Sequence, residues 1–248
     1  MKNLLKSMGL LKKNYKNELI PAAAGIIFVI AGAIIWTVYL FFDIGQFYIN
    51  QSFIFLTIII GLTGFVDDLA GSKDSQGFKG HFQQLLSGNL TSGAFKAFIA
   101  FITILFVIIS EENNFFDIFI NTALILLMTN FLNLLDLRPG RSLKFFILFS
   151  LLLITITPTL YIYYLPLFII LVPYIYYELK GKVMLGDTGS NALGVILGYG
   201  FSHWDNIYLK AFLVLFIGLL TILSEKYSFT GYIAGNKYLY WLDMLGRD

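Results

Sequence analysis

Three short polar segments contain residue types that could bind a metal ion and phosphate groups. They are Asp67-Asp68, the stretch 130–141, and Gly-Asp-Thr-Gly-Ser-Asn at 186–191. Four carboxylates stand in them without any cysteine: Asp67, Asp68, Asp136 and Asp187. Such a set suits Mg²⁺, which usually takes one or two carboxylates together with substrate phosphates. Adjacent carboxylates also repel each other, so one of the first pair could exchange a proton. The pattern predicts chemistry at a phosphate group.

The same segments supply candidate anion-binding groups. Arginine clamps phosphate through parallel hydrogen bonds, and free backbone N–H groups at a helix start favour an anion. Taken singly, each feature has a simpler explanation as a solvated helix end, a topology signal or an N-cap. Their occurrence together on one side favours a site. The candidate substrate-binding residues are Asn133, Arg138, Arg141, Lys144, Gly186, Thr188 and Ser190.

The composition indicates that a lipid bilayer surrounds these segments. Hydrophobic residues make up 58% of the 248 residues and charged residues 13%, whereas a soluble domain carries about 25% charge. The mean hydropathy is +0.77. The absence of cysteine excludes a disulfide scaffold, and two histidines argue against a histidine-rich zinc centre. A net charge of +2 is too small to imply nucleic acid as a partner. We therefore expect a polytopic membrane protein.

The apolar runs predict an all-α bundle of about eight transmembrane helices. A helix needs about 20 residues to cross the hydrocarbon, so the polar flanks of the shorter runs are expected to continue their helices. The seventh run reaches that length only if 189–202 is entirely helical. The runs are 20–42, 53–66, 94–109, 115–132, 143–156, 160–177, 192–201 and 208–223.

The basic residues predict the orientation of these spans, because lysine and arginine collect in cytoplasmic loops. With an internal N-terminus and eight spans, every lysine and arginine except Lys210 falls on the cytoplasmic side, as do both termini and all three polar segments. The outer turns carry acid instead: Asp43, Glu111, Glu112, Asp117 and Asp205. The chain then divides into a basic N-terminal segment (1–19), a transmembrane bundle (20–224) and an interfacial amphipathic tail (225–248).

The order of the motifs resembles the polyprenyl-phosphate N-acetylhexosamine-1-phosphate transferase superfamily, which includes the phospho-N-acetylmuramoyl-pentapeptide transferase and enzymes that start teichoic-acid synthesis. Pro21 to Gly25 stands where those enzymes carry Pro-Thr-x-Gly-Gly. Gly64 to Asp68 is similar to their Gly-x-x-Asp-Asp, and Gly186 to Ser190 to their Gly-Asp-Thr/Ser-Gly-Ser. Their Asn-x-x-Asp-Gly-x-Asp-Gly corresponds to Asn133-x-x-Asp136 followed by Pro139 in place of the second aspartate.

This resemblance implies Mg²⁺-dependent transfer of a sugar-1-phosphate from a nucleotide-sugar, UDP-linked, to polyprenyl phosphate, with release of UMP. By the same likeness Asp187 is the metal ligand. Asp67 and Asp68 handle the lipid phosphate and its proton, or the metal, and Asp136 belongs to the nucleotide-phosphate pocket. The implied setting is cell wall biogenesis at the bacterial inner (plasma) membrane, and a homodimer is left open.

Other functions are compatible with the same residues. The chain could use another donor, or hydrolyse a lipid-linked phosphate. It could also be a non-catalytic polyprenyl-phosphate-binding or accessory protein of envelope assembly, which would tolerate Asp187→Asn and Asp67→Asn. A small transporter is disfavoured, because the charged residues cluster at one face and not at mid-span.

The eight-span topology is directly testable with reporter fusions. Fusions at Asn50, Asn113 and Asp205 should report an external location, and a fusion in the stretch 136–140 a cytoplasmic one. A cytoplasmic signal at the first three positions would contradict the eight-span topology, and with it the convergence of the three polar segments on one side of the membrane.

Overall fold

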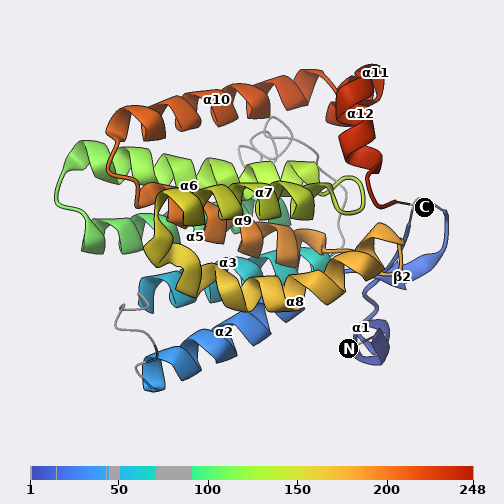
Figure 1. Cartoon of the computed structure of the whole chain (residues 1–248). Helices are drawn as coiled ribbons and strands as arrows, with labels where there is room; N and C mark the ends of the chain where they lie inside the picture. The colour runs from blue at the N-terminus through green and yellow to red at the C-terminus, as the bar shows by residue number, and fades with distance from the viewer. Residues whose placement is uncertain (1, 15, 43, 45–50, 71–90, 248) are drawn as a thin grey trace.

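The computed structural model describes residues 2–14, 16–42, 44, 51–70 and 91–247, which form a bundle of helices (Figure 1). The predicted cytoplasmic loop with Lys73 and Lys79, the outer residue Asp43 and the reporter position Asn50 lie outside the described residues.

Each of the eight predicted spans contains a helix in the described residues, and the polar flanks of the shorter runs do continue the helices. The predicted start of the first span was wrong: Ile20 and Pro21 belong to strand β2, and its helix begins at Ile26. Five of the helices (α3, α5, α6, α8 with its preceding 3₁₀ turn, and α10) are long and apolar enough to cross a membrane, and α2 is a shorter apolar helix. An all-α membrane bundle is therefore confirmed. The helices are α2 (Ile26–Phe41), α3 (Gln51–Ala70), α5 (Ser92–Glu111), α6 (Phe115–Leu135), α7 (Arg141–Ile156), α8 (Tyr161–Leu179), α9 (Gly186–Ser202) and α10 (Ile207–Lys226).

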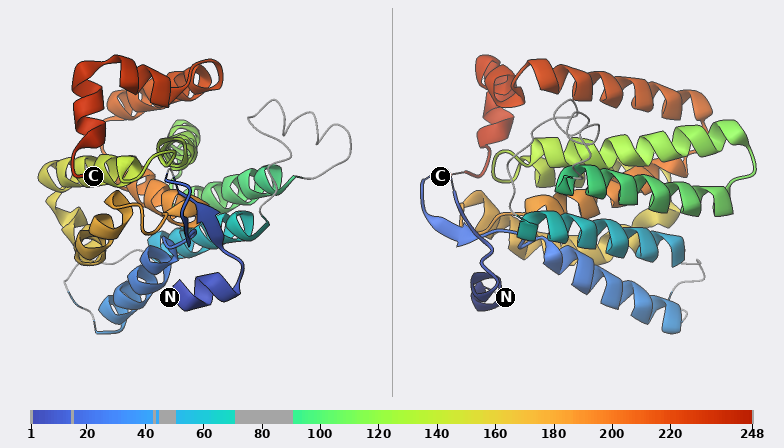
Figure 2. Two further views of the ribbon diagram at one scale, coloured as in Figure 1. Left: turned by 90° about the vertical axis from the view of Figure 1, so that its right-hand side faces the viewer. Right: turned by 180° about the vertical axis from the view of Figure 1, so that it is seen from behind.

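Smaller elements gather at one end of this bundle, where α3 ends and α9 begins; we call it the site end. They comprise α1 (Lys2–Ser7), an antiparallel hairpin of β1 (Leu11–Lys13) with β2 (Leu19–Pro21), α11 (Phe229–Gly235) and α12 (Lys237–Met244). The hairpin turn is closed by the Asn14 side chain, whose Oδ1 accepts hydrogen bonds from two following backbone N–H groups. Both chain ends lie at the site end (Figures 1 and 2).

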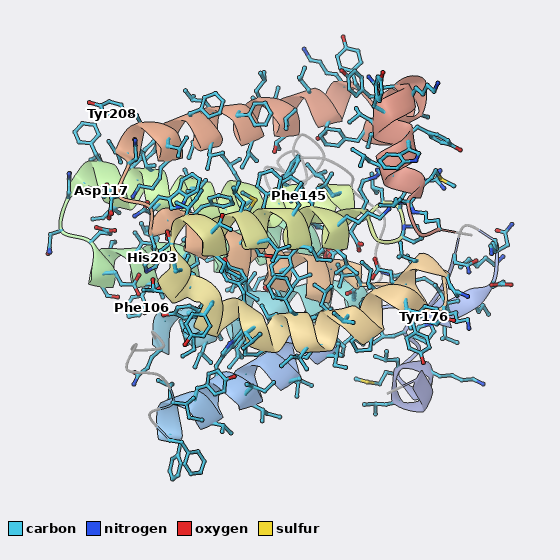
Figure 3. The ribbon with its side chains drawn as sticks, in the orientation of Figure 1. Phe106, Asp117, Phe145, Tyr176, His203 and Tyr208 are labelled. Carbon is cyan, nitrogen blue, oxygen red and sulfur yellow. The ribbon has the colours of Figure 1, made fainter. Side chains whose placement is uncertain are left out.

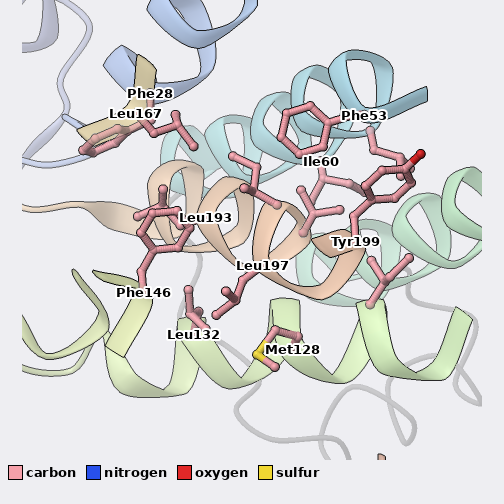
Figure 4. Packing of buried hydrophobic residues seen from close by; sticks show 14 of the residues in the cluster. Phe28, Phe53, Ile60, Met128, Leu132, Phe146, Leu167, Leu193, Leu197 and Tyr199 are labelled. Atoms are coloured by element: carbon pink, nitrogen blue, oxygen red, sulfur yellow. The ribbon is translucent and has the colours of Figure 1, made fainter. Parts of the chain in front are cut away.

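Helix α9 is the centre of the bundle. Every residue from Thr188 to Ser202 is buried, and Figure 4 shows Leu193 and Leu197 of α9 among side chains of α3, α6 and α7. Glycines allow this close packing: a Cβ on Gly194 would lie 2.5 Å from the Thr129 Cα, in α6. Small residues permit such backbone contact between membrane helices. The weakest apolar run is thus a helix that faces protein, where lipid-like hydrophobicity is not needed.

The outer surface is apolar, and the far end of the bundle is held by polar pairs. Phe106 of α5 and Tyr208 of α10 extend from the bundle near the far end in Figure 3. The single basic residue predicted outside, Lys210, is buried there; its Nζ donates to the Ser202 carbonyl at 3.2 Å and lies 3.8 Å from Asp117. A charge inside an apolar bundle needs such partners.

The close packing of α9 predicts an asymmetry between two helical glycines. Gly194→Ala places a methyl group against the α6 backbone, and overpacking of this kind costs about 1–3 kcal/mol. Gly218→Ala, in α10, meets nothing nearer than 3.7 Å and gains the same helix propensity. The melting temperature of the purified protein should therefore be lowered by Gly194→Ala and not by Gly218→Ala. Equal melting temperatures for the two variants would contradict the central position of α9.

Candidate active site

Backbone hydrogen bonds bring the Pro21 segment against the start of α9. The N–H groups of Ala24 and Gly25 donate to the carbonyls of Met184 and Leu185, each at 3.0 Å, and the Met184 N–H donates to Pro21 O at 2.9 Å. Gly186 opens the helix with φ +71°, a conformation that glycine adopts without strain. A Cβ there would lie 2.6 Å from Asp68 Oδ2. Two motifs separated by 160 residues of sequence thereby meet at one point.

Asp68 clamps the first turn of α9. Its Oδ2 accepts from the Thr188 backbone N–H at 3.0 Å and from the Thr188 hydroxyl at 2.9 Å. Its Oδ1 accepts from Lys12 Nζ at 3.0 Å, so the β1 strand is tied to the same carboxylate. The Asp68 side chain is 1% exposed, whereas Lys12 is 45% exposed. A carboxylate at a helix N-terminus is favoured by the unpaired N–H groups and the helix dipole. Asp68 therefore positions the first turn of α9, which carries Asp187.

Asp67 points to a different set of partners. Its Oδ2 accepts from Lys96 Nζ at 2.8 Å, and the same ammonium contacts Asp187 Oδ2. The three side chains come from α3, α5 and α9, and they are 19–30% exposed. One ammonium thus lies between two carboxylates, so the group of three side chains has a net negative charge when both carboxylates are ionised. The adjacent aspartates have separate environments, which the sequence motif alone does not reveal.

Two polar side chains extend this cluster toward α6. Asn133 Nδ2 donates to Asp187 Oδ2 at 3.4 Å, and its Oδ1 accepts from the Ser190 hydroxyl at 3.2 Å. Ser190 also donates to the Gly186 carbonyl at 2.9 Å. The structure therefore brings together residues from all three predicted polar segments.

Asp136 lies beside this cluster, in the wall of a cavity of about 260 Å³ at the site end. The wall also includes Lys13 of the hairpin, Arg138, and Glu178 at the end of α8. Burial raises the pKa of Asp136 well above its ordinary value, and neighbouring carboxylates, Glu178 first among them, add to the rise. The cavity therefore presents carboxyl and cationic groups together, and its wall includes Leu185, two residues before Asp187.

The predicted phosphate clamps do not all face this cavity. Arg138 lines it. Arg141 forms a forked pair with Asp243 of α12, at 2.8 and 2.9 Å, and Lys144 Nζ donates to the carbonyls of Leu242 and Asp243. A role of Arg141 and Lys144 at a substrate phosphate stays a prediction, and the structure gives both residues partners in the C-terminal helix.

Sequence reasoning missed four polar side chains that belong to this end of the molecule. Lys96 was interpreted only as an orientation signal, although an ionisable residue one turn inside an apolar helix is a functional candidate. Lys12 was interpreted in the same way. Glu178, at the end of α8, and Asp243, in the tail, have no neighbouring motif that marks them. Their roles depend on tertiary contacts with Gly140 and Arg141.

The carboxylates of the site fit a hard divalent ion only if a bound substrate supplies the remaining ligands of that ion. Among the described residues, no group of three or more His, Cys, Asp or Glu side chains is arranged to hold a metal. Two carboxylates, Asp67 and Asp187, converge on one cation, the Lys96 ammonium. Mg²⁺ is commonly bound by one or two carboxylates, waters and substrate phosphates. The residues present therefore fit Mg²⁺ as a partner of bound phosphate, without a full protein cage.

Fold and site define an all-α membrane protein with a carboxylate–ammonium cluster at one end of its bundle. The family model of glycosyl transferase family 4 matches residues 50–202, and the chain belongs to this family. Its members are transferases that move phospho-sugars to polyprenyl-phosphate lipid carriers. A search of curated proteins finds no match to the chain. The family inferred from the order of the motifs is confirmed.

The geometry predicts that substitutions of the two adjacent aspartates lower the free energy of unfolding by different amounts. Asp68→Asn removes an ion pair and one charge-assisted acceptor from a buried group, so it should lower the free energy of unfolding by about 1–3 kcal/mol. Asp67→Asn leaves Lys96 paired with Asp187 and should lower it by less than about 1 kcal/mol. Denaturation of both purified variants measures the difference. Equal losses of stability would contradict the separate roles.

Proposed function

We propose that this chain catalyses Mg²⁺-dependent transfer of a sugar-1-phosphate from a UDP-linked sugar to polyprenyl phosphate. The observation that carries the proposal is the convergence of Asp67, Asp187 and Lys96 at the start of the buried helix α9. Carboxylates for a metal and an ammonium for phosphate oxygens are what a reaction between two phosphates needs, since such reactions depend mainly on positioning and charge neutralisation. Membership of the family supports the same reaction class.

Asp187 and Asp67 would hold the Mg²⁺. When bound, the ion neutralises charge on the phosphates that meet there. The Lys96 ammonium lies between the same two carboxylates. With Mg²⁺ bound to the carboxylates, this ammonium would bind phosphate oxygens of the substrate. Asn133 and Ser190 orient Asp187 through their shared hydrogen bonds. Asp68 keeps the N-terminal turn of α9 in place, through Thr188.

The reaction is a displacement at the phosphorus that carries the sugar. An oxygen of the polyprenyl phosphate attacks this β-phosphorus of the UDP-sugar, and a new P–O–P bond forms. The bond between the β-phosphorus and the bridging oxygen breaks, so UMP leaves with that oxygen. The second pKa of a phosphate monoester is about 6, so the attacking oxygen is largely deprotonated at neutral pH and Asp67 remains available for the ion.

The cavity would receive the nucleotide part of the donor. Arg138 lines it and could bind a phosphate, and Asp136 and Glu178 offer acceptors for N–H or O–H groups. The lipid acceptor would approach from the bilayer. With the basic residues inside, the site end faces the cytoplasm, where nucleotide-sugars are available. We place the protein in the bacterial inner membrane, in cell wall biogenesis, with both termini cytoplasmic.

A transfer assay tests this proposal. Purified protein with polyprenyl phosphate, Mg²⁺ and a panel of UDP-sugars should release UMP and form a lipid-linked product. Asp187→Asn removes a charge without changing size, so activity should fall at least 100-fold while protein yield is unchanged. Asp205→Asn, at an exposed outer position, serves as the matched control and should keep full activity.

The outcome separates the leading function from its alternatives. Full activity in Asp187→Asn would remove this residue from the site. Absence of transfer with every donor, together with binding of polyprenyl phosphate that both Asp187→Asn and Asp67→Asn retain, would contradict the enzyme and favour a non-catalytic lipid-phosphate-binding protein.

A further inference from the structure

The C-terminal residues 228–247, which we call the strap, run from the end of α10 to the turn between α6 and α7. In Figure 1 the helices α11 and α12 descend from α10 toward the turn that precedes α7. At the beginning of the strap, Phe229 packs edge-on against Phe131 of α6, with ring centroids 6.1 Å apart. At its end, Arg247 Nε donates to the Pro139 carbonyl at 2.7 Å. The strap is thus attached at both ends to the helix pair α6–α7.

Asp243 is the centre of the strap's polar contacts. Its two carboxylate oxygens accept from Arg141 Nε and Nη2, and also from Arg247 Nη1 and Nη2 at 3.1 and 2.8 Å. All three side chains are 10% exposed or less. Although burial alone raises the pKa of Asp243, the hydrogen bonds from both arginines lower it below its ordinary value, so the carboxyl group is ionised at neutral pH. Removal of this charge would leave two buried guanidinium groups facing each other.

The turn that the strap contacts is part of the cavity wall. Asp136, Leu137, Arg138 and Pro139 all line the cavity. On one side the turn is held by Glu178, which accepts from the Gly140 N–H at 2.8 Å. On the other side it is held by Arg247. Gly140 has φ +74° and packs closely against Leu179 of α8, where a Cβ would lie 2.4 Å from the leucine side chain. The turn is therefore held against α8 on one side and by the strap on the other.

We propose that Asp243 is a positioning residue: through Arg141 and Arg247 it fixes the 136–140 turn, and the strap thereby sets the shape of the nucleotide side of the site. The nucleotide assignment rests on the function proposed above, whereas the fixing of the turn does not. The strap contributes no atom to the reacting groups. Its effect reaches the site only through the wall formed by Asp136 and Arg138.

A spin label in the turn tests the mechanical part independently of activity. The chain contains no cysteine, so Leu137→Cys, at a side chain 62% exposed, gives a single labelling position. With Asp243→Asn the label should become at least twofold more mobile in electron paramagnetic resonance spectra. Asp205→Asn at the far end should leave the spectrum unchanged. Asp243→Glu keeps the charge and should restore most of the immobilisation.

Arg247→Lys provides a second variant if Asp243→Asn fails to fold. It keeps the positive charge but loses the planar fork and the Nε donor to Pro139, so the label should again be mobilised. An immobile label in both the Asp243→Asn and the Arg247→Lys proteins would overturn the proposal.

The link to the site is tested by the binding of UMP in the presence of Mg²⁺, measured by calorimetry. The dissociation constant should rise about tenfold in Asp243→Asn, with the affinity for polyprenyl phosphate changed less than twofold. A purely stabilising role of the strap would shift the melting temperature and leave the UMP affinity unchanged, which would also overturn the proposal. If the parent protein binds no UMP, the proposed function fails, and the spin-label result still decides whether the strap fixes the turn.

Discussion

The close burial of α9 between α3 and α6 is the constraint on which the site depends. From Thr188 to Ser202 this helix is entirely inside protein, and glycine permits backbone contact along it. A helix that is buried on all sides cannot shift without opening the whole bundle. Its first turn is therefore a fixed point, and Asp187, Thr188 and Ser190 are presented there to the ends of α3, α5 and α6.

Charge balance at this fixed point follows from the apolar surroundings. Isolated charges are costly near a membrane interior, and the motif aspartates Asp67, Asp68, Asp136 and Asp187 outnumber the two ammonium groups, of Lys12 and Lys96, that pair with them in the described residues. Lys96 neutralises part of the negative charge of Asp67 and Asp187. Lys12 does the same for Asp68. The remaining negative charge is available for a divalent cation, and a cation so held attracts phosphate. The proposed binding of Mg²⁺ together with phosphate follows from this distribution of charge. The charges of the strap are paired with Arg141 and with each other, so in this proposal the strap contributes shape.

Much of this arrangement was predictable from the sequence, because hydropathy and motif order are local signals. The eight helices, the all-α class and the family follow from them. The position of α9 at the core does not, since its glycine-rich sequence gives the weakest apolar signal of all the runs. The partners of individual side chains could not be predicted from the sequence either. Whether Arg141 contacts a substrate or Asp243 depends on where α12, about 100 residues later in the chain, packs. The sequence around Lys96 likewise does not indicate that this lysine pairs with Asp67 of α3 and Asp187 of α9. The β-hairpin was missed because its strands have only three residues each.

The central claim is that Asp67 and Asp187 form a divalent-cation site that phosphate completes. Titration with Mn²⁺, a hard cation that can replace Mg²⁺, followed by electron paramagnetic resonance with and without UMP, measures this directly. The account predicts weak binding of Mn²⁺ alone, at least tenfold tighter binding with UMP present, and loss of that enhancement in Asp187→Asn but not in Asp205→Asn. Mn²⁺ binding that is unaffected by UMP, or that Asp187→Asn leaves intact, would contradict it.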